Sequence, residues 1–170
     1  CLTIRFTSDN SINFEGWKGT WSCSLEPCEN EELLEIEQGA DNETIVDALS
    51  TPLADITVDT IICESTAYGT FVNGDNTDLG LGRGLLLTSG SATNAIGPNS
   101  STSEGTSFFT PGDSDLDSLS ILFGDGTTSQ DACIIEVDVT AYTNVLEFEY
   151  IFGSEEYPEF VNQVFNDIFA

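Results

Sequence analysis

Apolar and polar side chains alternate along several short stretches of this chain, the pattern of β-strands that turn one face to a core. Clusters of Gly, Asn, Asp, Ser and Thr bound these stretches and predict turns. The expected strands are residues 2–6, 12–14, 56–63, 68–72, 84–88, 132–139, 145–152 and 164–170. Apolar residues three and four apart predict one short helix over residues 44–53, capped near Asn42 or Thr44. The sum is an all-β sandwich or jelly roll with one helix.

The order of these elements divides the chain into three segments. Residues 1–23 are interpreted as a hairpin that closes a β domain. Residues 24–42, with seven acids, are expected to be a linker; a short exposed helix over 31–37 is the alternative. Residues 43–170 hold the remaining strands, and the apolar last strand predicts that the sequence ends inside a domain. Within them, residues 89–118 are expected to be a long functional or metal-ordered loop.

The net charge of the chain limits which partners and cofactors are expected. Thirty acidic residues and three basic ones give a formal net charge of -27. Such a charge repels phosphate backbones and anionic lipids, so neither nucleic-acid binding nor direct membrane insertion is expected. It also strains a folded chain by self-repulsion, and crowded carboxylates attract Ca²⁺. Calcium is therefore the expected cofactor, and a solvated acidic coat that keeps the protein soluble is the alternative.

The cysteines point to an oxidising, extracellular environment. There are five of them, with no methionine and no histidine. Cys1 opens the sequence, so its partner is expected upstream. The other four are Cys23, Cys28, Cys63 and Cys133. Sequence does not settle their pairing; Cys23 with Cys28 and Cys63 with Cys133 is the favoured set, and free buried thiols are the alternative.

Two acidic motifs are candidate calcium sites. The first places carboxylates and an Asn-Asp pair at the two ends of a short loop: Glu155, Glu156, Glu159, Asn166 and Asp167. The second has alternate acids in a predicted loop: Asp113, Asp115 and Asp117. The alternatives are structural, because adjacent Glu side chains point to opposite faces of a strand and acids on a loop edge are often merely solvated.

Smaller motifs add little chemistry. The glycine-rich stretch at residues 80–84 precedes an expected strand, so it predicts a tight turn and not a phosphate loop. Asn42 and Asn99 fit the N-glycosylation sequon.

Several longer motifs resemble known extracellular families. Residues 3–11 and 16–21 resemble the last two strands of a CUB domain. Residues 90–99, 110–117, 152–160 and 165–169 together resemble the choice-of-anchor L family, over about residues 43–170. That family comprises modules of large secreted bacterial surface proteins, many from Bacteroidetes, with varied C-terminal tails for anchoring or export. It implies no catalytic residue.

The resemblances also imply modification and metal residues. Asp9 matches an aspartate that helps bind calcium in calcium-binding CUB domains. Thr60 and Ser118 lie in stretches that are similar to the short O-glycosylation signal of exported Bacteroidetes proteins.

The function expected from these features is structural or adhesive, at the bacterial cell surface. Without histidine, the usual triad base and zinc ligand are missing, so an enzyme is not expected. Other copies, other surface proteins and polysaccharide are the expected partners, and a subunit of an extracellular filament is one variant. The alternative is a calcium-dependent carbohydrate-binding module of a secreted hydrolase, with Tyr157 and Phe160 on a sugar-binding face.

Overall fold

The computed structural model describes residues 34–77, 79–97, 101, 104–123, 128–154 and 167–170. The chain divides into two units, Cys1–Glu31 and Glu32–Ala170, and every described residue belongs to the second. The hairpin expected at residues 1–23 therefore lies outside the described residues. No helix of the described part is long and apolar enough to cross a membrane.

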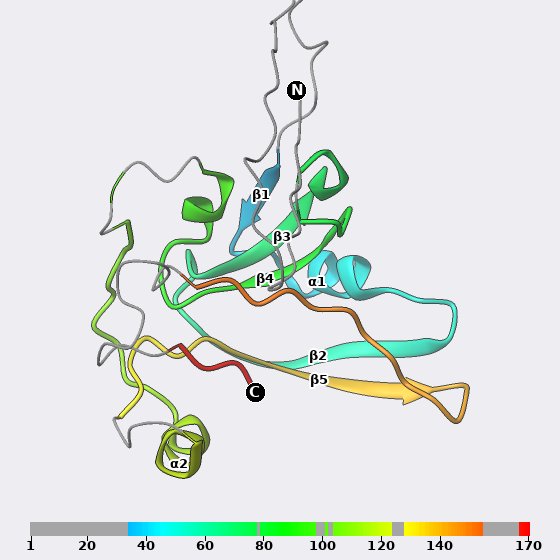
Figure 1. Ribbon diagram of the computed structural model, residues 1–170. Helices are drawn as coiled ribbons and strands as arrows, with labels where there is room; N and C mark the ends of the chain where they lie inside the picture. Colours follow the sequence, from blue (N-terminus) through cyan, green and yellow to red (C-terminus); the bar gives the residue numbers. More distant parts are fainter. Residues whose placement is uncertain (1–33, 78, 98–100, 102–103, 124–127, 155–166) are drawn as a thin grey trace, which may run out of the picture. The chain divides into compact units, whose positions relative to one another are not determined.

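Two antiparallel sheets form the domain (Figure 1). The first has the order β1-β3-β4, with β1 Glu35–Gln38, β3 Tyr68–Val72 and β4 Gly84–Leu87. The second pairs the long strands β2 Ala54–Ile62 and β5 Ile134–Ala141, with an irregularity between Val58 and Thr60. The arrangement confirms the expected all-β, sandwich-like domain.

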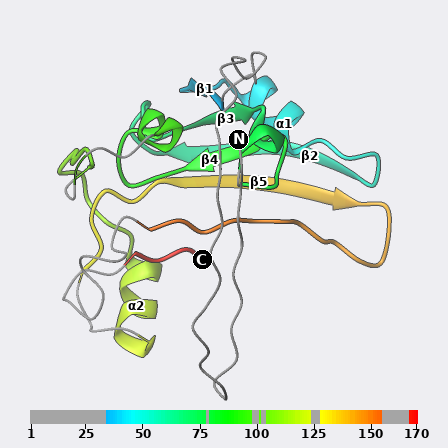
Figure 2. The ribbon, with the colours of Figure 1, turned by 45° about the horizontal axis from the view of Figure 1, so that its top comes forward.

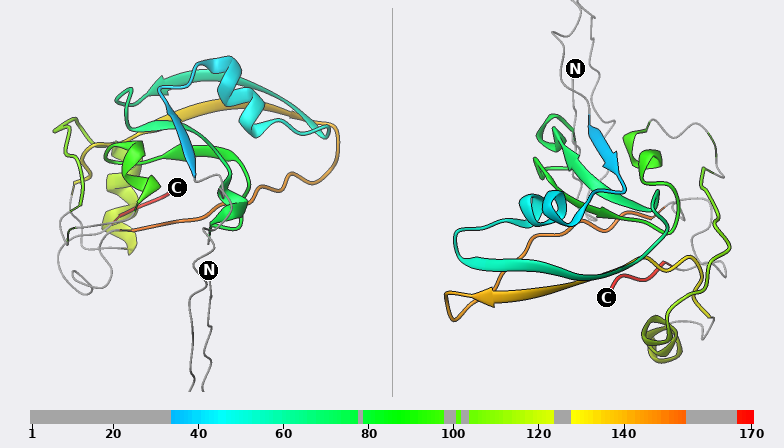
Figure 3. Two further views of the ribbon diagram at one scale, coloured as in Figure 1. Left: turned by 90° about the horizontal axis from the view of Figure 1, so that it is seen from above. Right: turned by 180° about the vertical axis from the view of Figure 1, so that it is seen from behind.

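Helix α1, Asn42–Leu49, packs against β2, β3 and β4 (Figure 3). Its N-cap is Asp41, whose carboxylate accepts a hydrogen bond from the Thr44 backbone N–H at 2.9 Å. That bond holds the pKa of Asp41 below its ordinary value. The helix was expected over residues 44–53 with a cap near Asn42 or Thr44, so it begins two residues earlier and ends four residues earlier than expected.

The core lies between the two sheets and α1. Ile45 of α1 is fully buried, and it clusters with Ala40 and Tyr68. The partly buried residues packed against this cluster come from α1 and from both sheets: Leu49, Val58, Ile61, Cys63, Leu85, Leu87, Cys133 and Ile135. Leu85 and Leu87 alternate along β4, and Cys133 and Ile135 alternate at the start of β5, as expected of strands that turn one face to a core.

Three expectations were wrong in detail. The expected linker 24–42 contains β1, which pairs with β3 from Glu35↔Val72 to Gln38↔Gly69. The sequence did not predict this strand, because two of its four residues are Glu, which has little strand propensity. Residues 89–118 are not one long loop, because the 3₁₀ turn η2, Ala92–Ile96, and the start of helix α2, Ser114–Phe123, fall inside them. The described part of the domain therefore has two α-helices and not one.

Residues 145–152 also differ from the expectation of a strand. The chain reverses direction after β5 and returns as an extended segment without regular secondary structure (Figure 2). Between the described strands, β5 pairs with β2 and not with this segment. Residues 167–170 are likewise irregular, and residues 164–166 of the strand expected there lie outside the described part.

Candidate functional site

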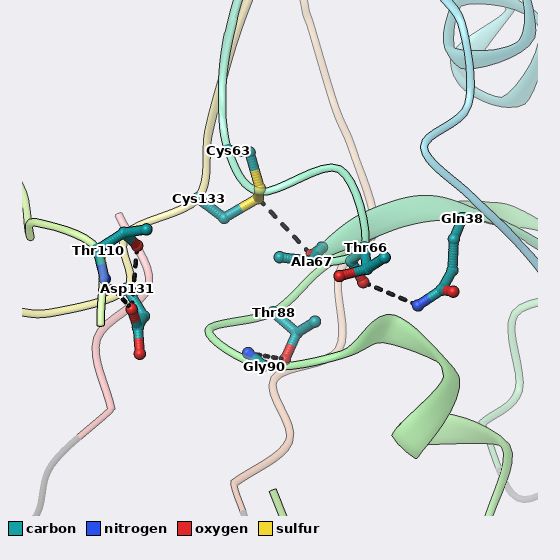
Figure 4. The surroundings of a disulfide bond; sticks show 9 residues. All are labelled: Gln38, Cys63, Thr66, Ala67, Thr88, Gly90, Thr110, Asp131 and Cys133. Atoms are coloured by element: carbon teal, nitrogen blue, oxygen red, sulfur yellow. Dashed lines mark hydrogen bonds between the residues drawn. A yellow bond between two sulfur atoms is a disulfide. The ribbon is translucent and has the colours of Figure 1, made fainter. Parts of the chain in front are cut away.

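A disulfide joins the two long strands at one end. Cys63 directly follows β2, and Cys133 directly precedes β5; their sulfur atoms are bonded, which confirms the favoured pairing (Figure 4). The Cys133 sulfur lies 3.7 Å from the Ala67 carbonyl oxygen. The bond thus fixes the place where the chain enters β5 from the segment before it. Cys23 and Cys28 lie outside the described residues, so their pairing stays a prediction.

The carboxylate of Asp131, two residues before Cys133, binds the backbone of residues 108–110. The Asp131 side chain accepts hydrogen bonds from the backbone N–H of Phe108 at 3.2 Å and of Thr110 at 2.7 Å, and from the Thr110 hydroxyl at 3.0 Å. The Asp131 N–H donates back to the Thr110 carbonyl at 3.1 Å. Figure 4 shows Thr110 and Asp131 facing each other. Asp131 therefore fixes the backbone on both sides of Phe109.

The start of α2 is tied to the same place through Ser129. Asp113 caps the helix: one of its side-chain oxygens accepts the N–H groups of Asp115 at 2.8 Å and Leu116 at 3.2 Å. The Asp117 carboxylate accepts the N–H of Ser129 at 2.5 Å and its hydroxyl at 2.7 Å. These two bonds lower the pKa of Asp117.

We call residues 104–113, residues 128–131 and the first turn of α2 the loop cluster. The segments 104–113 and 128–131 meet in an isolated antiparallel β-bridge between Pro111 and Gln130. They approach so closely at Gly112 that a Cβ there would lie 2.1 Å from the Ser129 carbonyl oxygen. Glycine is required at this position for space.

An open hollow of about 330 Å³ lies in the loop cluster. The described residues that line it are uncharged: Phe109, Thr110, Pro111, Gly112, Thr128, Ser129 and Gln130. Phe109 is 88% exposed and has a positive φ of 59°, which is uncommon for a residue with a Cβ. Sequence reasoning missed these residues, although a Phe-Phe pair within a run of small polar residues was a visible signal.

The predicted calcium residues fall in different places. Asp113, Asp115 and Asp117 lie at the N-terminal end of α2, so the expectation of an extended loop with alternate acids on one side was wrong. A helix of 3.6 residues per turn spreads alternate residues around its axis. The signal for this helix was an N-cap Asp followed by Leu116, Leu119 and Phe123 at helical spacing.

The other predicted calcium site is described only at one residue. Asp167 accepts a hydrogen bond from the Ser154 hydroxyl at 2.6 Å, which joins the residues flanking the segment 155–166. Asp9, Glu155, Glu156, Glu159 and Asn166 lie outside the described residues. Within the described ranges, no group of three or more acids or cysteines is placed to hold a metal ion.

Three of the four predicted glycosylation residues belong to the described part of the chain. Asn42 is the exposed first residue of α1, and Asn99 lies outside the described part. Thr60 is half-buried in β2, and its hydroxyl donates to the Asp59 carboxylate at 3.0 Å. Ser118 is exposed on α2 and donates to the Ser114 carbonyl at 2.9 Å. The three described residues, Asn42, Thr60 and Ser118, lie on three different elements.

Comparison with known proteins identifies the family of the domain. A sequence model of the choice-of-anchor L domain matches residues 35–170, from the first residue of β1 through both sheets, the disulfide and the loop cluster. No curated protein and no solved structure matches the chain. The chain therefore belongs to the choice-of-anchor L domain family, a family of bacterial cell-surface and secreted proteins.

Proposed function

We propose that this chain is a structural and adhesive module of the bacterial cell surface that binds a strand of another surface protein and is stabilised by calcium. The role is non-catalytic. An extracellular filament or a surface layer is the kind of assembly in which such a module serves. The absence of histidine from the sequence supports a binding role over an enzymatic one.

The observation that carries the proposal is an exposed apolar strip in an otherwise acidic chain. The strip consists of Val145, Leu146, Phe148, Tyr150, Ile151, Phe152, Ile168 and Phe169. Phe148 is 75% exposed and Tyr150 is 62% exposed. The rings of Tyr150 and Phe169 stack with centroids 5.4 Å apart, so the strip joins two segments that are distant in sequence. Large exposed apolar side chains that gather in this way mark an interaction surface.

The shape of the strip favours a β-strand as its occupant. Residues 145–152 are extended, and within the described part they pair with no strand. Their backbone N–H and C=O groups can therefore form a ladder with an added strand, and the aromatic side chains give that strand apolar neighbours.

Charge selects the partner. Glu147 and Glu149 alternate with the aromatic residues of the strip, and the whole chain carries a net charge of -27. A second copy would meet like charges, which weakens self-association. The proposed occupant is therefore a different surface protein, whose strand alternates apolar residues with Lys or Arg.

Calcium is proposed from charge and chain placement. Divalent ions relieve the self-repulsion of so many carboxylates. The hydrogen bond between Ser154 and Asp167 supports a site at this end of the domain, because it brings together the two residues that border the predicted ligands Glu155 and Asn166.

The strand proposal is tested with a synthetic ten-residue peptide that alternates valine with lysine. We expect it to bind the wild-type chain, and to bind the double variant Phe148→Ser/Tyr150→Ser at least about tenfold more weakly. The variant keeps every charge, so a loss of affinity reports the apolar strip and not general attraction of a cation. Leu122→Ser, at a 70% exposed leucine of α2, is the matched control and should bind as the wild type does.

Hydrogen exchange tests whether the peptide binds along residues 145–152. The bound peptide should slow exchange of the backbone amides of residues 145–152. Equal affinity of the wild type and the double variant would contradict the proposal. So would protection of these amides, without any peptide, in a longer form of the protein, since other residues of the same protein would then cover the strip.

A further inference from the structure

The hollow in the loop cluster has the chemistry of a sugar subsite. An exposed phenyl ring stands beside a surface whose described lining residues carry hydroxyl and amide groups and no charge. The C–H groups of a pyranose ring pack on an aromatic face, while its hydroxyls exchange hydrogen bonds with neutral polar side chains. At about 330 Å³, the hollow is at the small end of ligand sites and suits one or two sugar rings.

The ring of Phe109 is held outward at a backbone cost. Phe109 and Asp131 both have positive φ, at 59° and 51°. Asp131 accepts the N–H groups on either side of Phe109, so the unusual conformation is enforced by bonds from a neighbouring segment. A left-handed non-glycine residue persists only when its surroundings determine it, and such residues concentrate at functional sites. Packing does not explain this one, because the side chain is 88% exposed.

The lining supplies suitable polar groups. The exposed side chains of Thr128 and Gln130 offer a hydroxyl and an amide, which both donate and accept. The Thr110 hydroxyl donates to Asp131, and its oxygen keeps a lone pair for a ligand donor.

Charge around the hollow excludes acidic ligands. The carboxylates of Asp113, Asp117 and Asp131 hold the loops that form the hollow, and the chain as a whole is strongly negative. Uronic acids, sulfated sugars and phosphate would be repelled. A neutral hexose remains.

We propose that Phe109 and the hollow beside it bind a sugar ring of a neutral polysaccharide, with Phe109 as the stacking platform. Asp131 is a positioning residue, because it acts through the backbone on either side of Phe109. The site shares no residue with the apolar strip and does not depend on the protein contact proposed above.

The test uses the whole chain and four soluble probes: cellohexaose, maltohexaose, mannohexaose and hexagalacturonate. Calorimetry should show at least one neutral hexasaccharide binding with a dissociation constant on the order of 0.1 to 1 mM, and no binding of hexagalacturonate. The backbone amide NMR signals of residues 108–112 and 128–131 should shift on binding. Failure of all three neutral sugars to bind at about 10 mM would overturn the proposal.

Two substitutions sharpen the result. Phe109→Gly removes the ring and also relieves the positive φ, so it should lower sugar affinity at least about tenfold while the protein melts no lower than the wild type. Phe109→Trp should retain binding. Unchanged sugar affinity in Phe109→Gly would overturn the proposal.

The double variant Phe148→Ser/Tyr150→Ser distinguishes this proposal from the strand contact. It should bind the neutral hexasaccharide as the wild type does, whereas Phe109→Gly should bind the valine–lysine peptide normally. Loss of sugar binding in Phe148→Ser/Tyr150→Ser would place the sugar on the apolar strip and overturn the assignment to Phe109.

Discussion

Single carboxylates organise the loop cluster. Asp113, Asp117 and Asp131 each accept hydrogen bonds from backbone N–H groups that lie outside regular secondary structure or at a helix end. An ionised carboxylate is a strong acceptor with room for several donors, so one side chain can hold two strands of chain together. Part of the acidity of this protein is therefore used inside its own loops.

The bonds of Asp117 make the loop cluster sensitive to acid. Its pKa in the folded protein is lowered by Ser129, so the stability that these bonds contribute is present above the ordinary pKa of 3.8. That stability is lost as the pH falls through the lowered pKa. Asp117→Asn should thus melt at a lower temperature than the wild type at neutral pH, and the two midpoints should converge below about pH 3. Calorimetric melts from about pH 7 to pH 2.5 measure this convergence.

The control for this pH series is Asp115→Asn. Asp115 lies at the same end of α2, and its side chain is exposed. The substitution removes the same charge without removing an acceptor from Ser129. If the midpoints of Asp117→Asn and Asp115→Asn differed from the wild type by equal amounts at every pH, the role assigned to Asp117 would be refuted.

At the scale of elements, the elements predicted most accurately are those with their own local signal. Strand β3 occupies residues 68–72, as expected, because Tyr, Thr, Phe and Val are strong strand formers bounded by turn residues. Strand β1 was missed because four residues that alternate Glu with Ile and Gln have little propensity of their own. They become a strand through pairing with β3. Which strand pairs with β1 is decided by the tertiary structure and not by the local sequence.

The disulfide supports the pairing of β2 with β5. Cys63 and Cys133 are 70 residues apart, so the bond greatly restricts the unfolded chain. Replacing both, as Cys63→Ala/Cys133→Ala, should lower the free energy of unfolding by about 2–4 kcal/mol. Urea denaturation, monitored by far-ultraviolet circular dichroism, measures the free energy of unfolding of the wild type and the variant.

The double substitution is preferred to a reducing agent, because three further cysteines are present in the sequence. Wild-type protein kept oxidised is the reference. A variant as stable as the oxidised wild type would show that the bond does not stabilise this domain.

At the scale of the whole molecule, net charge is the dominant feature. A charge of -27 on 170 residues opposes folding by self-repulsion, and the described core is small, with Ile45 as its one large fully buried side chain. Counterions that screen these charges are therefore expected to stabilise the folded chain. Screening by any salt differs in kind from occupation of a site by calcium.

Thermal melting can separate these two effects. We expect calcium at about one hundred times its dissociation constant to raise the melting midpoint by roughly 5–10 °C over sodium chloride of equal ionic strength. A chelator should reverse the gain. Asp167→Asn should reduce it, whereas Asp138→Asn, at an exposed acid of β5, should leave it unchanged. Equal midpoints in calcium and sodium chloride would contradict a specific calcium site.

Local sequence alone determined the strand and helix types of β2, β3, β4, β5 and α1, the acidic and extracellular character, and the family. Periodicity and composition are properties of neighbouring residues, so they can be read without a fold. Only the tertiary structure decided that Asp131 and Ser129 hold the loop before α2, and that Tyr150 meets Phe169. Those contacts join residues distant in the chain, and their energies depend on which surfaces the two sheets bring together.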